Sequence, residues 1–445
     1  MSKDFYATRS TSWWKVAIAM IGSALSAATY VSVTGMPRES GWGYLQMVMG
    51  FFLGYLVIAF VLSPLYFRLN VTSVYEYLDG RFGVTTHKTG AWFFLGSKLL
   101  GASVRMYVMI FILQSLIEER CSIPIWLTTL VIMALVWLYT VRGGVRAVLT
   151  LDIIKTVTML AAVVLCLVLI AGNAPDYSMM RVFYFDDIDS KQYFFKQFLG
   201  GFFTVIALTG LDQDMMQRTL ACKNVRDSQK NLMLSIVLQA VFITLFLLLG
   251  VYLYSYADAN GIPVGKSDEV FKAVTCSKTM RLYPLAGILF TVGLIMAGFP
   301  SGGSSLTSLT TSFTIDILGG KEKYRKWVHT GMAVAMGVII VIFDAINDKS
   351  LIEAIYTLAS YTYGPILGLF AFGLLFKRKV RDRWVPLVCI LAPLLCLVLS
   401  MNSKAWLGCY EFGYEILPIN AIFTMIGLWA ISCHSERSEE SPDNK

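Results

Sequence analysis

Residues 284–316 read PLAGILFTVGLIMAGFPSGGSSLTSLTTSFTID, an apolar run that leads directly into a segment rich in hydroxyl side chains. Nine of the seventeen residues from Pro300 onward are Ser or Thr. The stretch is long enough for a transmembrane helix, and lipid would offer these hydroxyls no partner. Pro300 adds to the question, because it removes a backbone donor and frees the carbonyl of Met296 one turn earlier.

The whole chain shares this apolar character. It has 445 residues, 56% hydrophobic and 15% charged, with a mean hydropathy of +0.63. Because a soluble domain carries about 25% charged residues, the composition predicts an integral membrane protein with many helices. The eight Cys include no CxxC pair and the three His lie at segment ends or beyond them, so no metal framework or disulfide scaffold is indicated. The sequence also lacks HExxH and P-loop motifs, which argues against an embedded enzyme.

Apolar segments alternate with charged loops along the chain. Twelve segments are predicted, at 13–34, 43–67, 89–117, 122–141, 148–172, 194–216, 231–256, 284–312, 327–347, 350–376, 384–401 and 414–433. Alternate loops, among them 68–88, 218–230 and 377–383, carry about twenty Lys and Arg, against about eleven in the opposite set. Positively charged loops stay in the cytoplasm, so we expect residues 1–12 and the polar tail 434–445 to be cytoplasmic and the protein to lie in a cell membrane. The net charge of +8 then belongs to these loops and does not indicate nucleic-acid binding.

Four charges stand out in the apolar segments, where charges are costly and often functional: Lys98, Arg105, Asp152 and Lys155. Asp152 and Lys155 are three residues apart on one helical face, so they can form an ion pair, or Lys155 can extend to the membrane surface. For Lys98 we expect a structural pair or the same extension. Arg105 lies at mid-segment, where an unpaired Arg costs roughly 2.5–3.5 kcal/mol on insertion scales. It therefore needs a structural carboxylate or an anionic ligand.

The hydroxyl run has two interpretations. Six of its members share helical spacing: Ser301, Ser304, Ser305, Ser308, Thr311 and Ser312. Small hydroxyl residues let membrane helices pack closely and bond back to carbonyls, which accounts for most of the run. Around Pro300, freed carbonyls beside hydroxyls also form a set of oxygen ligands for a hard cation, as at the broken helices of secondary transporters. Residues 22–37, GSALSAATYVSVTGMP, offer a second break of the same kind.

Four further motifs occur in an order that resembles the sodium:solute symporter family. They are DFYATRSTSWWKVAIAMIGSALSAATYVSVTGMP at 4–37, SVYEYLDGRFG at 73–83, YTVRGGVRAVLTLD at 139–152 and GLDQDMMQRTLACKN at 210–224. The resemblance implies an all-α polytopic membrane protein with the five-plus-five inverted-repeat, leucine-transporter-like fold and about 12 transmembrane helices. The ten-helix core would span 13–376, with repeats at 13–172 and 194–376, followed by two additional helices in 377–433. Most members have one more helix before the first core helix, so Met1 is expected to be a shortened start.

The resemblance also implies a position for sodium. In the family a sodium ion lies between the broken first core helix and the eighth. Matching this chain to that motif gives these ligands: the carbonyls of Gly22, Leu25 and Ala297 and the hydroxyl of Ser301. The family usually has a second hydroxyl where this chain has Pro300, so proton coupling in the same fold stays open as an alternative.

A second sodium occurs in some members of the family. Asp152 matches an acidic position that helps to bind it, and Ser304 is the one hydroxyl that remains of the other ligands. Lys155 stands where the family often has Gln. A lysine so close to Asp152 can substitute for the second cation, which favours one sodium over two.

The solute is expected at mid-membrane between the first, third and sixth core helices. By the resemblance, Ser26, Thr29 and Gln46 would line its site and Gln213 would support it. Arg105 falls where sialic-acid members hold the substrate carboxylate. The predicted function is therefore sodium-coupled symport, by alternating access, of an acidic solute such as a sialic acid or another sugar acid. A neutral sugar or amino acid remains an alternative, and an embedded enzyme or a transporter-like sensor is a more distant one.

Overall fold

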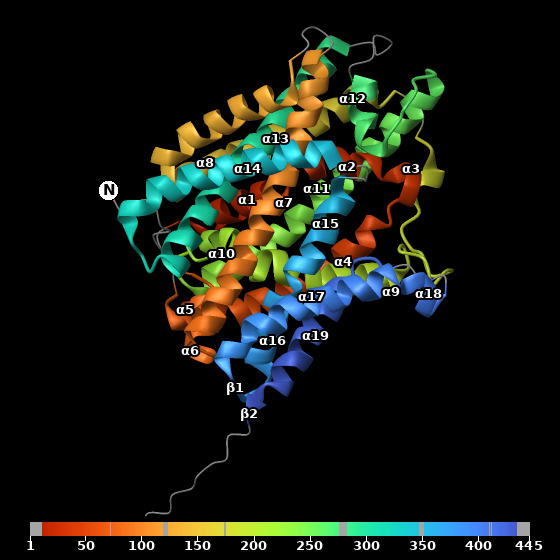
Figure 1. The fold of residues 1–445 in the computed structure, drawn as a ribbon. Coiled ribbons are helices and arrows are strands. Elements are labelled where there is room, and N and C mark those ends of the chain that lie inside the picture. Colours follow the sequence, from red (N-terminus) through yellow and green to blue (C-terminus); the bar gives the residue numbers. More distant parts are fainter. Residues whose placement is uncertain are drawn as a thin grey trace, which may run out of the picture.

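The computed structural model describes residues 11–71, 73–118, 123–172, 175–275, 283–346, 351–408, 410 and 412–433, and most of them are helical (Figure 1). The predicted tail 434–445 and all but the end of the predicted N-terminus 1–12 lie outside the described residues. The α-helices are α1 (Trp13–Ala24), α2 (Ala27–Gly35), α3 (Pro37–Ser40), α4 (Tyr44–Val57), α5 (Ser63–Leu69), α6 (Glu76–Arg81), α7 (Val84–Glu118), α8 (Ile125–Ile170), α9 (Phe194–Val205), α10 (Gln213–Thr219), α11 (Val225–Ala259), α12 (Val270–Thr275), α13 (Tyr283–Ser312), α14 (Arg325–Ile346), α15 (Leu351–Thr362), α16 (Gly364–Leu375), α17 (Val385–Met401), α18 (Ser403–Leu407) and α19 (Ile416–Ala430).

Shorter elements join or extend these helices. The π-helical turns are Ile58–Leu62, Ile206–Gly210 and Phe313–Ile317, and the 3₁₀ turns are Tyr177–Met180, Ser267–Glu269, Glu322–Tyr324 and Asp382–Trp384. The strands β1 (Lys379–Val380) and β2 (Ser432–Cys433) pair antiparallel, with Lys379 opposite Cys433. This pairing ties the ends of α16 and α19 together.

The helices account for the twelve predicted apolar segments. Within the described residues, seven helices are long and apolar enough to cross a membrane, two bent helix pairs each pass the same test together, and three apolar helices are shorter. The helix α8 runs through two predicted segments, whose apolar parts are Ile125–Val141 and Val148–Ile170. Over the described part of the chain, each of the twelve predicted segments thus contains an apolar helix or a bent helix pair, and up to nine of them are long enough to cross a membrane.

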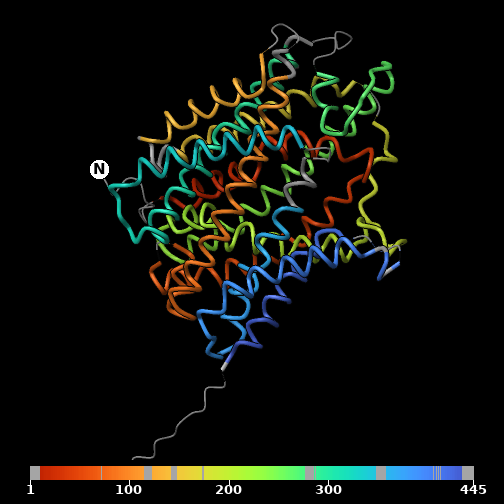
Figure 2. Tube along the Cα trace, viewed as in Figure 1, coloured from red at the N-terminus to blue at the C-terminus, as the bar shows by residue number. Residues whose placement is uncertain are grey.

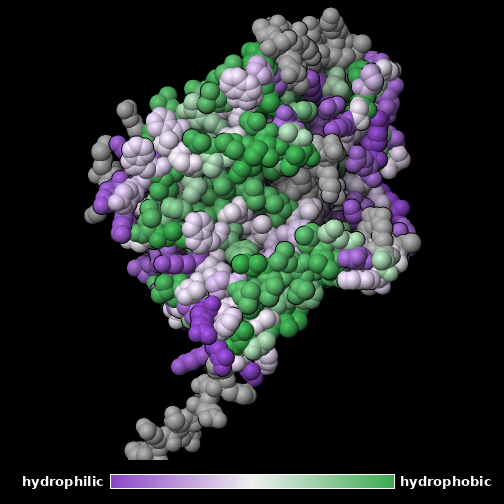
Figure 3. Space-filling model, viewed as in Figure 1, coloured by the Kyte–Doolittle hydropathy of each residue, from purple (hydrophilic) through white to green (hydrophobic). Residues whose placement is uncertain are grey.

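The surface has the polarity of a membrane protein. On the face shown in Figure 3, apolar side chains cover the middle of the molecule, and polar side chains gather toward its left, right and lower edges. Large apolar residues such as Trp327, Val168 and Leu138 are more than 60% exposed. Since exposed apolar side chains on this scale are stable only in lipid, the chain is a multi-pass membrane protein.

Two of the apolar helices are broken. A bend of 62° separates α1 from α2, and one of 70° separates Phe194–Gly210 from α10. At the first break, Ser26 has extended backbone and forms a capping box with Thr29, whose Oγ1 accepts from the Ser26 amide at 3.3 Å. At the second, the side chain of Asp212 accepts from the amides of Asp214 and Met215. Local capping thus starts a new helix at each break.

The broken helix α1–α2 lies at the centre of the packing. Its trace, red in Figure 2, runs through the middle of the molecule, where α1 contacts α8, α10, α11 and α13. A Cβ added at Gly22 would lie 2.4 Å from the carbonyl oxygen of Asp152 and 2.6 Å from Thr156 Oγ1. Only glycine fits at this crossing, so Gly22 lets α1 approach the second half of α8.

Two details differ from the sequence interpretation. The helix α13 continues through Pro300 without a break, because its neighbours α7 and α8 pack along it while one backbone hydrogen bond is lost. The predicted segment 350–376 is instead two helices, α15 and α16, which meet at Tyr363. Pro365 stands in the first turn of α16, where a proline is compatible with helix initiation.

Candidate functional site

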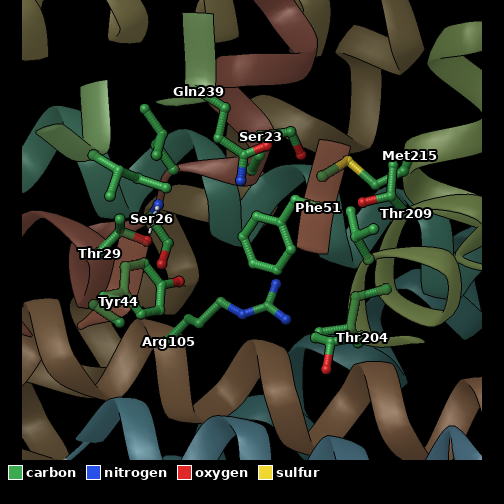
Figure 4. Close-up of a pocket in the computed structure, with 16 residues that line it drawn as sticks. Ser23, Ser26, Thr29, Tyr44, Phe51, Arg105, Thr204, Thr209, Met215 and Gln239 are labelled. Carbon is green, nitrogen blue, oxygen red and sulfur yellow. Dashed lines mark hydrogen bonds between the residues drawn. The ribbon is translucent and has the colours of Figure 1, made fainter. Parts of the chain in front are cut away.

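A cavity of about 100 Å³ lies at the break between α1 and α2 (Figure 4). Its walls come from the break itself and from α4, α7, α9, α10 and α11. The polar side chains that line it are Ser23, Ser26, Thr29, Tyr44, Arg105, Thr204, Thr209 and Gln239. Each of these side chains can donate or accept hydrogen bonds. The cavity therefore suits a small polar ligand.

Arg105 carries the only charge among the described residues that line this cavity. It projects from α7 into the space beside Phe51, with Thr204 farther along the same wall (Figure 4). Within the described part of the chain, its guanidinium has no hydrogen-bond or ion-pair partner. The sequence argument that Arg105 needs a partner therefore stands, and the fold leaves this cation facing a cavity.

The amino terminus of α2 faces the same space. Ser26 is the N-cap of this nine-residue helix, and Ser26 and Thr29 both line the cavity. Helix amino termini carry partial positive charge and favour anions. Arg105 and the end of α2 thus create one electropositive cavity from two distant parts of the sequence.

Of the five predicted solute residues, the structure brings three together and places two elsewhere. Arg105, Ser26 and Thr29 line the cavity. Gln46 instead binds the loop between α8 and α9, donating to the Gln192 carbonyl at 3.0 Å and accepting from the Tyr184 amide at 3.1 Å. Gln213 accepts from the Val74 amide at 2.9 Å. These backbone contacts hold both amides away from the cavity lining.

The predicted sodium residues divide between two neighbouring places. Leu25 lines the cavity at the α1 end, and Gly22 lies one turn earlier, against α8. On α13, the Ser301 hydroxyl donates to the Ala297 carbonyl at 3.1 Å. The same oxygen accepts from Lys155 Nζ at 2.5 Å, and Lys155 is fully buried. A cation of the chain itself therefore contacts the hydroxyl predicted to bind sodium.

A buried ion network lies next to Ser301. Arg218 Nη2 is 2.9 Å from Asp152 Oδ2, and Arg218 Nη1 is 2.5 Å from Asp214 Oδ1. Lys98 Nζ is 3.0 Å from Asp212 Oδ2 and 2.9 Å from Asp214 Oδ2. All five side chains are at most 3% exposed. Buried charges of this kind are tolerated when they are paired and hydrogen-bonded.

Two predicted sodium residues belong to this network. Asp152 uses Oδ2 to bind Arg218, while its buried Oδ1 has no hydrogen-bond partner among the described residues. Ser304 donates to Asp214 Oδ1 at 2.7 Å and also contacts Arg218 Nη2. The prediction that Ser304 and Asp152 lie close together agrees with this geometry, although both already have protein partners.

The sequence interpretation missed most of the network. Lys98 forms a structural ion pair with Asp212 and Asp214, which was one of the two predicted alternatives for this residue. The assignment of Arg218 to a charged cytoplasmic loop was wrong, because α10 turns back into the protein and buries this side chain completely. The four-residue spacing of Asp214 and Arg218 was an available signal, since such pairs face each other on a helix.

Comparison with known proteins gives a consistent picture. The protein-family model described as "Sodium:solute symporter family" matches residues 5–382 of this sequence. The sodium-coupled monocarboxylate transporter 1 of Mus musculus is 24% identical over 440 residues, which cover 94% of this chain and 70% of the mouse protein. The sodium/sialic acid symporter NanT of Aliivibrio fischeri is 24% identical over 392 residues, 82% of this chain and 76% of its own length.

A solved structure is similar over nearly the whole chain. It is a substrate-bound, outward-open state of a Na⁺-coupled sialic acid symporter, with a TM-score of 0.79 and 19% identity, and the match covers 96% of this chain and 90% of that one. A second is Mhp1, a nucleobase-cation-symport-1 family transporter, with a TM-score of 0.64 and 14% identity over 95% of this chain and 92% of that one. The predicted helical inverted-repeat fold is confirmed by this likeness.

Proposed function

Since the chain belongs to the sodium:solute symporter family, we propose that its solute is a small organic anion whose carboxylate binds Arg105. Membership makes it a membrane transporter with sodium as the co-transported ion. The proposal concerns what is carried with the sodium and how the two bind.

The state of Arg105 carries this proposal. A cation at mid-membrane with no partner among the described residues is costly unless a ligand or water meets it. A guanidinium binds a carboxylate through two parallel hydrogen bonds, which add geometry to charge. The amino terminus of α2 lines the same cavity and would face the same anion. A neutral sugar would leave the Arg105 charge without a counter-ion, whereas an amino acid would offer its own carboxylate.

The size of the cavity favours a small carboxylate. A volume of about 100 Å³ accommodates an acid with a short carbon chain without any rearrangement. One relative is named for monocarboxylates, which is the chemistry we propose here. A sialic acid is the second candidate, because a sialic acid symporter has a closely similar fold. That larger acid would require the cavity to widen.

Sodium is proposed to bind where α1 ends, beside α13. Helix carboxyl ends present free carbonyls and partial negative charge, which suit a hard cation. Gly22 and Leu25 would supply carbonyls from α1, and Ala297 and Ser301 would supply oxygens from α13. One sodium carried with one monoanion moves no net charge, so the sodium gradient alone would drive accumulation by alternating access. We further propose that the protein lies in a cell membrane with both termini in the cytoplasm, on the basis of its positively charged loops.

A binding screen tests this proposal without any assumption about rate. The purified chain in detergent would be heated in sodium chloride with a series of short carboxylates, their uncharged amides, a sialic acid and a neutral sugar. A ligand that binds the folded state raises the melting temperature with its concentration. We expect short carboxylates to stabilise the protein and their amides to have no effect. Equal stabilisation by acid and amide would refute the role of Arg105.

A further inference from the structure

Lys155 lies where the sodium ion is proposed to bind. Its fully buried ammonium donates to Ser301 Oγ at 2.5 Å, and that hydroxyl donates in turn to the Ala297 carbonyl at 3.1 Å. Ser301 and Ala297 are the two groups of α13 assigned to sodium. The contact also joins α8 to α13, the two helices that would enclose the ion together with α1.

The ammonium and a sodium ion cannot share this position at low cost. The three buried carboxylates nearby are balanced by three cations of the chain. The six charges are Asp152, Asp212, Asp214, Lys98, Lys155 and Arg218. A sodium at Ser301 would add a fourth positive charge next to an ammonium, and like charges repel strongly in a buried, weakly screened place. Sodium binding therefore requires the ammonium to move.

A second acceptor for the ammonium stands close by. Asp152 precedes Lys155 by three residues on α8, a spacing that places both side chains on one helical face. Its Oδ2 is held by Arg218, whereas Oδ1 is buried and has no hydrogen-bond partner among the described residues. An unsatisfied buried carboxylate oxygen is costly and would gain from a donor. A rotation of the flexible lysine side chain can supply one.

We propose that Lys155 is a tethered cation that holds Ser301 when sodium is absent and that sodium displaces toward Asp152 Oδ1. This inference rests on the proposed sodium position. Lys155 thereby sets the sodium affinity, since the ion must compete with an ammonium that is always present at high effective concentration. Sodium binding also breaks the Lys155–Ser301 contact between α8 and α13. The residue is thus a determinant of cation affinity and links ion binding to helix packing.

The test measures sodium binding with sodium alone. The full chain in detergent is melted across a sodium chloride series, with choline chloride holding the ionic strength constant, and the half-effective sodium concentration is recorded. Lys155→Gln and Lys155→Met remove the competing charge, so this concentration should fall about tenfold or more in both. Lys155→Arg is the matched control, because it keeps a cation on a long flexible side chain. It should show no fall.

Each outcome decides the proposal. An unchanged half-effective concentration in both neutral variants would overturn it, as would an equal fall in Lys155→Arg. If neither neutral variant gives a folded protein, the ammonium is a structural element and the proposal is also lost. A further outcome is that the natural chain shows no sodium response and Lys155→Gln gains one. This outcome would support the proposal that Lys155 occupies the position. It would refute the proposal that the natural chain binds sodium there. Failure of the carboxylate screen would leave these sodium results intact.

Discussion

Replacing Arg105 separates the charge of this side chain from its shape. Arg105→Lys keeps a cation on α7 but loses the planar fork, so one of two charge-assisted hydrogen bonds to a carboxylate disappears. Such a bond is worth about 1.5–3 kcal/mol, and each 1.4 kcal/mol is a factor of ten in affinity. We expect the apparent affinity for the carboxylate to fall about tenfold to a hundredfold.

Arg105→Gln removes the charge as well. Two unit charges 4 Å apart attract by about 4 kcal/mol at an effective dielectric constant of 20, which corresponds to nearly a thousandfold in affinity. Because Arg105 is half-buried against a cavity, screening by water reduces this figure, and we expect a loss between a hundredfold and a thousandfold. The protein should nevertheless fold, because no described carboxylate would be left unpaired.

The assay is solute-dependent stabilisation and uptake, with the sodium titration of the solute-free protein as the control. Both variants should keep the sodium response of the natural chain, because the proposed ion oxygens lie on α1 and α13. The reasoning is refuted if Arg105→Gln binds the acid as well as the natural chain does. It is also refuted if Arg105→Gln fails to fold, since Arg105 would then be a structural cation.

Three other substitutions test separate parts of the structure. Ser301→Ala removes the side-chain oxygen assigned to sodium, so the sodium concentration for half-maximal uptake should rise about tenfold or more; unchanged sodium dependence would place the ion elsewhere. Gly22→Ala would bring a Cβ within 2.4 Å of the Asp152 carbonyl and should cost about 1–3 kcal/mol of stability by overpacking. Gly96→Ala is the control, because its Cβ meets nothing within 4 Å and the change should be neutral. Equal melting temperatures of the two variants would contradict this expectation. Lys98→Met leaves two buried carboxylates short of a partner and should cost about 3–5 kcal/mol of stability, seen as a lower melting temperature and yield. A stable variant would show that Arg218 and Lys155 are enough to balance the network.

The sequence predicted best where one residue by itself is out of place. Arg105 is such a residue, because its depth in an apolar segment is visible without any knowledge of its neighbours. A break within residues 22–37 was predicted for a similar reason, since small and hydroxyl residues interrupt an apolar run. The structure locates it after Leu25, where Ser26 caps a new helix. Local rules alone therefore indicated one cation and one helix break, which the structure brings to the same cavity.

Pairings between distant segments were harder to predict. The partners of Lys98 come from α10, more than a hundred residues later, and burial of Arg218 depends on α10 turning inward after a 70° bend. Gln46 and Gln213 were placed near the solute by resemblance, yet backbone amides and carbonyls of nearby loops bind both side chains. Such contacts depend on tertiary geometry, which spacing along the chain does not determine.

Uptake into sealed proteoliposomes tests the central claim most directly. A labelled short monocarboxylate and its uncharged amide are each offered with a tenfold inward sodium gradient, with equal sodium on both sides, and with choline in place of sodium. Carriage of one anion with one sodium predicts up to about tenfold accumulation of the acid with the gradient, little effect of membrane potential, and no accumulation in the other two conditions. Accumulation of the amide, or accumulation of the acid to the same level in choline, would contradict sodium-coupled transport of an organic anion.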